Sequence, residues 1–374
     1  MNGVRRLNEA GVSVWLDDLG RDRLDSGELA RLVECGVSGV TTNPTIFAKA
    51  VGAGEHYAAD LARLAAQGVD PETAVSALTT EDVRRACDVL SGVYTESDRV
   101  DGRVSLEVDP RLARDTAATV DQARRLWRTV DRPNLMVKVP ATVEGLPAVT
   151  TLLGEGISIN VTLIFALQRY DAVLEAWLAG LQQAHAAGHD LAGIGSVASF
   201  FVSRVDTMVD PILQAAVDRG DSAAAQCLGT AALANARLAY QHFLAFVDRP
   251  EWQQLADHGA RPQRPLWAST STKNPAYDPT MYVTGLVAPL TVNTLPAATL
   301  DAVVDDPSLA ADVPVDTVSA AGAAAEQVMA ALADHGVDMD AVVAQLERDG
   351  VSSFAASWTQ LIGAVEQALV RARP

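Results

Sequence analysis

Short apolar runs alternate with amphipathic helical patterns along most of this chain. The expected strands are residues 12–17, 39–42, 104–108, 135–139, 157–160, 194–197, 266–269 and 286–292. Strands separated by helices indicate parallel β-α units joined by right-handed crossovers. Eight such units predict an α/β protein with a single (βα)8 TIM barrel. An open doubly wound sheet is the alternative, although no Gly-x-Gly-x-x-Gly motif follows any of the runs.

Local signals place several of the intervening helices. A helix over residues 28–35 is expected to stop at Gly36, because glycine readily adopts the positive φ that ends many helices. Asp109 followed by Pro110 predicts the N-cap and first turn of the helix before the fourth strand. Residues 202–217 repeat apolar side chains at helical spacing and predict another helix.

Two segments exceed what a minimal barrel needs. Residues 48–103 predict a helical insertion of two or three helices before the third strand. Residues 300–374 predict a C-terminal helical extension, with an acidic beginning and an alanine-rich stretch. Because no linker of low complexity separates these segments, residues 1–374 are expected to form one domain.

Charge and composition exclude several classes of partner. The net charge of −18 argues against nucleic acid or an anionic membrane as the main partner. No leader-like segment opens the chain and no apolar run reaches the ~20 residues that span a bilayer, so a cytoplasmic location is expected. The three cysteines are scattered and form no Cys-x-x-Cys pair, so we expect no bound metal.

Lys138 is the most unusual single residue. The chain has only three lysines among its 29 basic residues, and this one lies within the apolar sequence Leu-Met-Val-Lys-Val. Removing an amine from water disfavours its charged form, and a neutral amine is the nucleophile that forms a Schiff base with a carbonyl. A barrel lysine paired with a carboxylate is the other interpretation, and this segment alone does not separate the two.

Polar residues gather where the predicted strands end. Asp17 ends the first strand and Asn43 follows the second, while Glu107 lies in the third and Lys138 in the fourth. In a (βα)8 barrel the chemistry occurs at this face, so these side chains are expected to meet there. Any one of them alone is more simply a turn or N-cap residue. Together they predict a coupled cluster of titrating groups suited to Schiff-base chemistry.

Three motifs occur in the order seen in one enzyme family. The sequence Gly-Val-Thr-Thr-Asn-Pro-Thr-Ile at 39–46 resembles the transaldolase signature, usually written Thr-Thr-Asn-Pro-Ser. Residues 135–140 resemble that family's active-site lysine strand, and residues 159–164 resemble its fifth strand. The similarity runs from about Val12 to Leu295. It implies a TIM barrel that acts on small-molecule sugar phosphates with neither metal nor cofactor.

The resemblance also implies catalytic roles. Lys138 would form the Schiff base with the ketose, and Asp17 would be the base that drives carbon–carbon cleavage. Glu107, with a water held by Thr162, would move protons as the carbinolamine forms and breaks down.

Substrate-binding roles follow in the same way. Asn43, Asn160 and Ser199 would bind the hydroxyls of the dihydroxyacetone unit. Phe201 and Arg204 lie in a segment that resembles the family's Ser-Pro-Phe-Val-Gly-Arg, which makes Arg204 the phosphate ligand. The loop after the seventh strand departs from the family pattern, and there Lys273 is the expected second phosphate ligand.

The implied activity is transfer of dihydroxyacetone from sedoheptulose 7-phosphate to glyceraldehyde 3-phosphate in the pentose phosphate pathway. A lyase similar to fructose-6-phosphate aldolase is one alternative. Such lyases typically have Gln where Glu107 stands and Tyr where Phe201 stands, so both positions favour the transferase. A catalytically silent barrel that binds sugar phosphates is the other alternative. The chain is expected to be a monomer or a homodimer.

Overall fold

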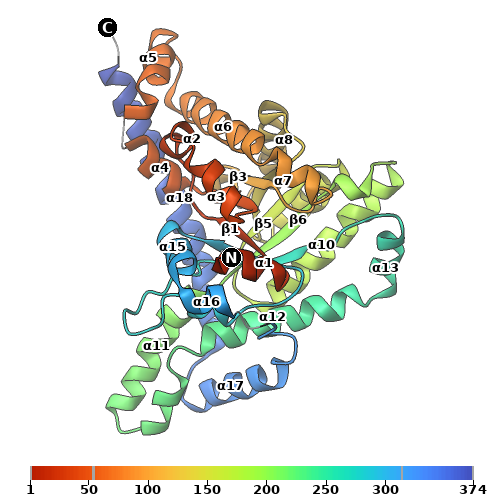
Figure 1. Ribbon diagram of the computed structural model, residues 1–374, viewed down its shortest axis with the longest axis vertical. Coiled ribbons are helices and arrows are strands. Elements are labelled where there is room, and N and C mark those ends of the chain that lie inside the picture. The colour runs from red at the N-terminus through yellow and green to blue at the C-terminus, as the bar shows by residue number, and fades with distance from the viewer. Residues whose placement is uncertain (1, 53–54, 313–314, 373–374) are drawn as a thin grey trace.

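Eight parallel strands form a closed barrel in the computed structural model, which describes residues 2–52, 55–312 and 315–372 (Figure 1). In chain order they are β1 (Val12–Leu16), β2 (Gly39–Thr41), β3 (Arg103–Glu107), β4 (Leu135–Pro140), β5 (Ile159–Ile164), β6 (Ser196–Phe201), β7 (Arg264–Ala268) and β8 (Thr291–Leu295). Each strand pairs with the next, and β8 pairs with β1. The predicted TIM barrel is therefore confirmed.

Helices follow the strands and enclose the barrel. Those before β3 are α1 (Gly3–Glu9), α2 (Arg21–Asp25), α3 (Glu28–Cys35), α4 (Pro44–Gly52), α5 (Ala58–Ala66), α6 (Pro71–Val89) and α7 (Ser91–Glu96). Those between β3 and β8 are α8 (Thr116–Val130), α9 (Gly145–Gly154), α10 (Leu167–Ala186), α11 (Ser203–Asp218), α12 (Ala231–Val247), α13 (Pro250–Asp257) and α14 (Met281–Thr284). Those after β8 are α15 (Ala297–Asp305), α16 (Pro307–Ala311), α17 (Gly322–Asp334) and α18 (Met339–Arg371). Short 3-10 turns are η1 (Glu55–Tyr57), η2 (Pro110–Leu112), η3 (Leu191–Gly193) and η4 (Ser222–Cys227).

Four strands differ from the prediction by two residues or more at one end. The seventh begins earlier than expected, at Arg264. The fifth and sixth strands begin and end later than expected, at Ile159–Ile164 and Ser196–Phe201. The eighth begins only at Thr291, because Pro289 has no N–H to donate and Leu290 adopts a φ of 58°. Before it, Leu286, Val287 and Ala288 are buried outside any strand, so their hydrophobicity resembles that of a strand, whereas Leu290 is exposed.

One helix start was also predicted wrongly. Asp109 caps only the short turn η2, where its side chain accepts a hydrogen bond from the Arg111 amide. Helix α8 begins later, with Asp115 as its N-cap accepting from the Ala118 amide. The two Asp signals lie six residues apart, and the sequence alone did not show which one starts the long helix. The predicted end of α3 at Gly36 is confirmed, with a φ of 112°.

A close contact between β1 and β2 shows how side-chain size shapes the barrel. Trp15 is aligned with Gly39 across these two strands, and Trp15 is fully buried. A Cβ atom at Gly39 would lie 2.5 Å from the Trp15 ring. Glycine at this position therefore makes room for the largest side chain of the first strand.

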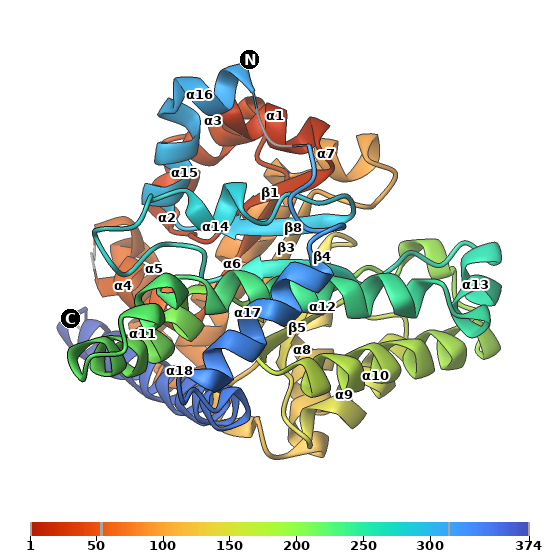
Figure 2. The same cartoon turned by 90° about the horizontal axis from the view of Figure 1, so that it is seen from below.

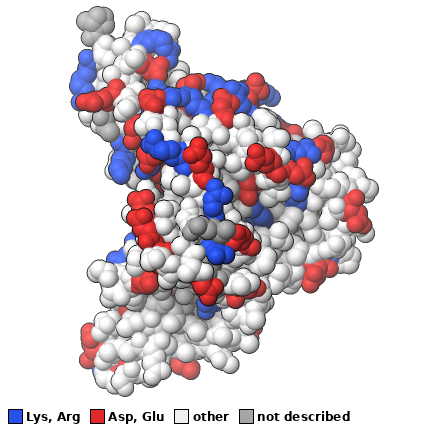
Figure 3. Space-filling model, viewed as in Figure 1, with Lys and Arg blue, Asp and Glu red and all other residues white. Residues whose placement is uncertain are grey.

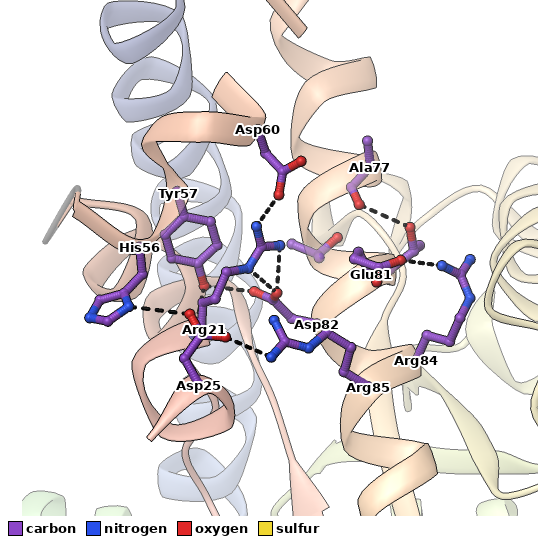
Figure 4. Close-up of polar contacts among 12 residues, drawn as sticks. Arg21, Asp25, His56, Tyr57, Asp60, Ala77, Glu81, Asp82, Arg84 and Arg85 are labelled. Atoms are coloured by element: carbon purple, nitrogen blue, oxygen red, sulfur yellow. Dashed lines mark hydrogen bonds and ion pairs between the residues drawn. The ribbon is translucent and has the colours of Figure 1, made fainter. Parts of the chain in front are cut away.

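Buried ionic contacts join the helices that precede β3. Arg21 of α2 donates from Nε to Asp82 Oδ1 of α6 over 2.8 Å, and it also pairs with Asp60 of α5. Tyr57 of η1 donates to the other oxygen of Asp82 over 2.6 Å. Figure 4 shows Arg21 enclosed by these three side chains. The contacts tie α5, α6 and η1 of the insertion to α2, the helix that follows β1.

The C-terminal helices return to the barrel rather than extending into solvent. Helix α17 packs on α12, and the long helix α18 runs beside α4, α5 and α6 (Figures 1 and 2). Helix α18 also contacts β5, η2 and α11, all near the carboxyl ends of the strands. Within the described residues no helix is long and apolar enough to cross a membrane.

Candidate active site

A cavity of about 230 Å³ opens at the carboxyl ends of the strands. Seven of the ten predicted site residues line it: Asp17, Asn43, Lys138, Ser199, Phe201, Arg204 and Lys273. The other three, Glu107, Asn160 and Thr162, are buried in β3 and β5 inside the barrel. The structure therefore brings the predicted residues to one place, although they come from segments far apart in the chain.

Lys138 lies on β4 and points into this cavity. Its side chain is buried, and its Nζ atom donates to the Thr42 carbonyl over 3.2 Å. Glu107 of β3 is directly aligned with it in the sheet, and Glu107 Oε2 lies 3.8 Å from Nζ. A separation of that length is an ion pair without a hydrogen bond, so proton exchange between the amine and Glu107 requires a bridging water or a small side-chain shift.

Glu107 has an unusual protonation equilibrium. Burial raises the pKa of its carboxyl to about 7, against an opposing effect of the Lys138 cation, and nearby Asp17 raises the pKa further. Neither carboxyl oxygen has a hydrogen-bond partner among the described residues. A carboxyl with a pKa near neutrality is suited to both donating and accepting protons.

Asp17 lies at the end of β1 on the opposite wall. Its Oδ1 accepts a hydrogen bond of 2.7 Å from the Thr41 hydroxyl, which lies 2.6 Å from the Thr294 hydroxyl. Burial raises the pKa of Asp17, while the Lys138 cation and the Thr41 hydrogen bond oppose that rise. The orienting hydroxyls leave the carboxylate directed at the cavity that it lines.

Strand β5 supplies polar groups next to Lys138. Asn160 is aligned with Lys138, donates to Ser105 Oγ over 3.0 Å and accepts from Ser199 Oγ over 2.7 Å. Both ends of the amide are thus fixed, which sets its orientation. Thr162 is fully buried, and its hydroxyl has no hydrogen-bond partner within the described parts of the chain.

The strand ends around the site depart from regular geometry. The pairing of β5 with β6 shifts register between Val161 and Ile164, and Leu163 between them adopts a φ of 63°. Ser269, just after β7, has a φ of 56°. Irregularities of this kind redirect side chains and are common beside active sites.

Asn43 both caps a helix and lines the cavity. Its Oδ1 accepts from the Ile46 amide over 3.0 Å and so caps the first turn of α4. The same residue lines the cavity. Capping orients the side chain and leaves its amide nitrogen to face the cavity.

Two cationic side chains lie at the outer part of the cavity. Arg204 in the first turn of α11 places its guanidinium carbon 5.1 Å from the centre of the Phe201 ring. Lys273 lies on the exposed loop after β7, and its Nζ donates to Ser271 Oγ over 2.6 Å. Partial loss of hydration lowers the pKa of Lys273, and the nearby Arg204 cation lowers it further. On the face in Figure 3 acidic and basic groups are interspersed. Arg204 and Lys273 are thus two cations lining one cavity of a protein with a net charge of −18.

Sequence reasoning missed several lining residues. Thr41 and Thr294 orient Asp17, and Ser269 contributes from the irregular end of β7. Phe354 reaches the cavity from α18, more than fifty residues after the last strand. Its apolar character indicates burial, but no local pattern shows that α18 returns to the barrel mouth.

The described residues contain no group of three or more His, Cys, Asp or Glu side chains placed to hold a metal ion. His185 and His189 are four residues apart, a spacing that can bind metal on a helix. However, α10 ends at Ala186, between the two histidines.

Comparisons with known proteins give a consistent result. A family model described as Transaldolase/Fructose-6-phosphate aldolase matches residues 14–365. A transaldolase from Acidothermus cellulolyticus is 54% identical over 371 residues, which cover 99% of this chain and 98% of that protein. One from Thermobifida fusca is 55% identical over 367 residues, covering 98% of each chain. Transaldolase 1 of Streptomyces coelicolor is 55% identical over 367 residues, covering 98% of this chain and 94% of its own.

Proposed function

Because the chain belongs to the transaldolase/fructose-6-phosphate aldolase family, we propose that its barrel cavity catalyses transfer of a dihydroxyacetone unit between sugar phosphates. The donor is sedoheptulose 7-phosphate and the acceptor is glyceraldehyde 3-phosphate. The products are erythrose 4-phosphate and fructose 6-phosphate. The observation that carries this proposal is the Lys138 amine, buried in the cavity between two carboxyls of raised pKa.

Lys138 is the nucleophile in the first step. Its amine passes one proton to Glu107, adds to the ketose carbonyl carbon and gives a second proton to the carbonyl oxygen. This forms a carbon–nitrogen bond and a carbinolamine. Glu107 then returns the proton to the carbinolamine hydroxyl, which leaves as water and yields the Schiff base. The two groups are 3.8 Å apart, so both transfers would pass through a bridging water. A water between Glu107 and Thr162 would satisfy their otherwise unpartnered oxygens and complete the proton path.

Asp17 acts in the cleavage step. Its carboxylate takes the proton from the substrate hydroxyl next to the carbon–carbon bond that breaks. The bonding electrons move into the protonated Schiff base, which becomes an enamine, and erythrose 4-phosphate leaves as the aldehyde. The enamine then attacks the carbonyl of glyceraldehyde 3-phosphate, and Asp17 returns its proton to the new hydroxyl. The hydrogen bond from Thr41 orients the carboxylate for these transfers.

Binding groups are arranged along the length of the substrate. Asn43, Asn160 and Ser199 hold the dihydroxyacetone hydroxyls near Lys138. Arg204 and Lys273 hold the phosphate at the outer end, where a guanidinium fork and a point charge complement each other. The fixed amide of Asn160 and the capped side chain of Asn43 supply preformed donors, which lowers the entropic cost of orientation.

Three wider features belong to the same proposal. We propose that residues 1–374 form one domain, since apolar residues from the insertion, the barrel and α18 belong to one continuous core. We further propose that the protein works in the cytoplasm as a monomer or a homodimer.

A transfer assay tests the activity and separates it from its alternatives. Fructose 6-phosphate is supplied with and without erythrose 4-phosphate, and glyceraldehyde 3-phosphate is measured over time. Sustained release that requires erythrose 4-phosphate is expected. Equal sustained release without the acceptor would identify a lyase, and no release under either condition would indicate a silent barrel.

A further inference from the structure

Helix α18 brings an aromatic residue to the mouth of the barrel. The helix comes close to the end of β5 because it has glycine there: a Cβ atom at Gly350 would lie 3.1 Å from Leu163 Cδ2 and 3.5 Å from Phe165 Cε2. One turn later, Phe354 lines the same cavity as Lys138. The C-terminal helices therefore form part of the active-site wall.

Phe354 lies directly beside the reacting groups. Its ring centre is 5.8 Å from Lys138 Nζ and 6.0 Å from the Arg204 guanidinium carbon. It meets the Phe201 ring edge to face, with 6.4 Å between ring centres and 63° between ring planes. Only 5% of the residue is exposed, so the ring fills space that solvent would otherwise enter.

A second contact fixes the register of α18 over the site. Ser357, three residues after Phe354, accepts a hydrogen bond of 2.9 Å from the Thr45 hydroxyl. Thr45 lies in the first turn of α4, two residues after Asn43, and also lines the cavity. The helix is thus attached to the segment that carries a substrate-binding residue.

We propose that Phe354 is a specificity-determining residue that keeps bulk water away from the Lys138–dihydroxyacetone adduct. Apart from the water proposed between Glu107 and Thr162, little water then reaches the adduct, so the bound unit passes to an aldose instead of being hydrolysed. This inference rests on the Schiff-base function proposed above. It assigns to the C-terminal helices a role in the choice between transfer and release.

The competing reaction shows what the ring prevents. When the enamine carbon takes a proton from Asp17, the adduct becomes a protonated Schiff base. Water then adds to its carbon, and the water's proton passes to Glu107. The carbon–nitrogen bond breaks, Lys138 regains a proton, and free dihydroxyacetone leaves. An apolar ring at 5.8 Å from Nζ offers an approaching water no hydrogen bond on that side.

The test compares release with transfer in Phe354→Ala. Fructose 6-phosphate alone should give a burst of about one equivalent of glyceraldehyde 3-phosphate, followed by a slow phase limited by hydrolysis of the adduct. The ratio of slow-phase release to acceptor-dependent transfer is expected to rise about tenfold in the variant. Phe354→Leu, which keeps more apolar bulk, should give a smaller rise and serves as the test if the alanine variant does not fold.

Leu361→Ala is the matched control. Leu361 is fully buried in the same helix but does not line the cavity, so this change loosens α18 without opening the site. An unchanged ratio in the Phe354 variants would overturn the inference. An equal rise in Leu361→Ala would also overturn it, because looser packing of α18 would then be the cause. If the unmodified protein gives no burst, the Schiff-base function itself fails, which is a different result from a burst with an unchanged ratio.

Discussion

Replacing Glu107 by glutamine is expected to stabilise the protein at alkaline pH while it impairs catalysis. Burial raises the pKa of Glu107 from its ordinary value of 4.5 to about 7. Each pH unit between these values corresponds to about 1.4 kcal/mol, so the ionised carboxylate costs the folded state about 3 kcal/mol relative to the unfolded chain. Glutamine has nearly the same shape and carries no charge, so it avoids this cost.

The pH window follows from the direction of the shift. Below about pH 4.5 the carboxyl is protonated in both states, and above about pH 7 it is ionised in both. Between these values the unfolded chain loses its proton first, so the free energy of unfolding falls as pH rises. The glutamine variant lacks this fall. It should match the unmodified protein near the acid end and exceed its stability by up to about 3 kcal/mol above neutrality.

Urea unfolding followed by tryptophan fluorescence measures the difference between the two proteins at several pH values. All other carboxyls are common to both proteins, so their titration largely cancels in the difference. Glu96→Gln, a change at an exposed glutamate, is the control and should give a difference that does not vary with pH. Transfer activity of Glu107→Gln should fall by about 10²–10⁴-fold, the usual contribution of a general acid–base. A stability difference that stays constant from pH 5 to pH 9 would show that the pKa of Glu107 is not raised in the folded protein.

Two further predictions concern other buried or charged groups. Asp82→Ala should lower the free energy of unfolding by about 3–5 kcal/mol, because it leaves the Arg21 guanidinium buried without its main partner. Urea unfolding measures this loss, and a loss below about 1 kcal/mol would contradict the prediction. Arg204→Gln should raise the KM for fructose 6-phosphate by more than Lys273→Gln does, because Arg204 is half-buried and Lys273 is exposed. Neither change should alter adduct formation with free dihydroxyacetone, which has no phosphate. If a variant formed the adduct equally poorly from dihydroxyacetone and from fructose 6-phosphate, the replaced residue would not be a phosphate ligand.

Much of the fold follows from residues that are neighbours in the sequence. The alternation of apolar strands with helices predicted the barrel, and Gly36 marked the end of α3 correctly. The errors arose where local signals compete. Asp109 and Asp115 are both good caps, and tertiary packing decides which one starts a long helix. The segment before β8 is as apolar as a strand, and the backbone geometry at Leu290, which keeps this segment out of the strand, has no sequence signature.

The candidate site was predictable for a different reason. In a (βα)8 barrel the carboxyl ends of all strands converge, so a polar residue at a strand end is placed by topology alone. Asp17, Glu107 and Lys138 could be brought together on that basis. Phe354 could not, because it lies on a helix whose position depends on contacts with α4, α6 and α11. Gly350 permits α18 to approach β5 closely, but the sequence does not show this, because the neighbours Leu163 and Phe165 are known only from the structure.

The central claim is that Lys138 forms a covalent Schiff base with the ketose substrate. Incubation with fructose 6-phosphate and borohydride, followed by peptide mapping by mass spectrometry, tests it most directly. One reduced dihydroxyacetone unit per chain, attached to Lys138, is expected. An unmodified protein, or a label on Lys49 or Lys273 instead, would contradict it.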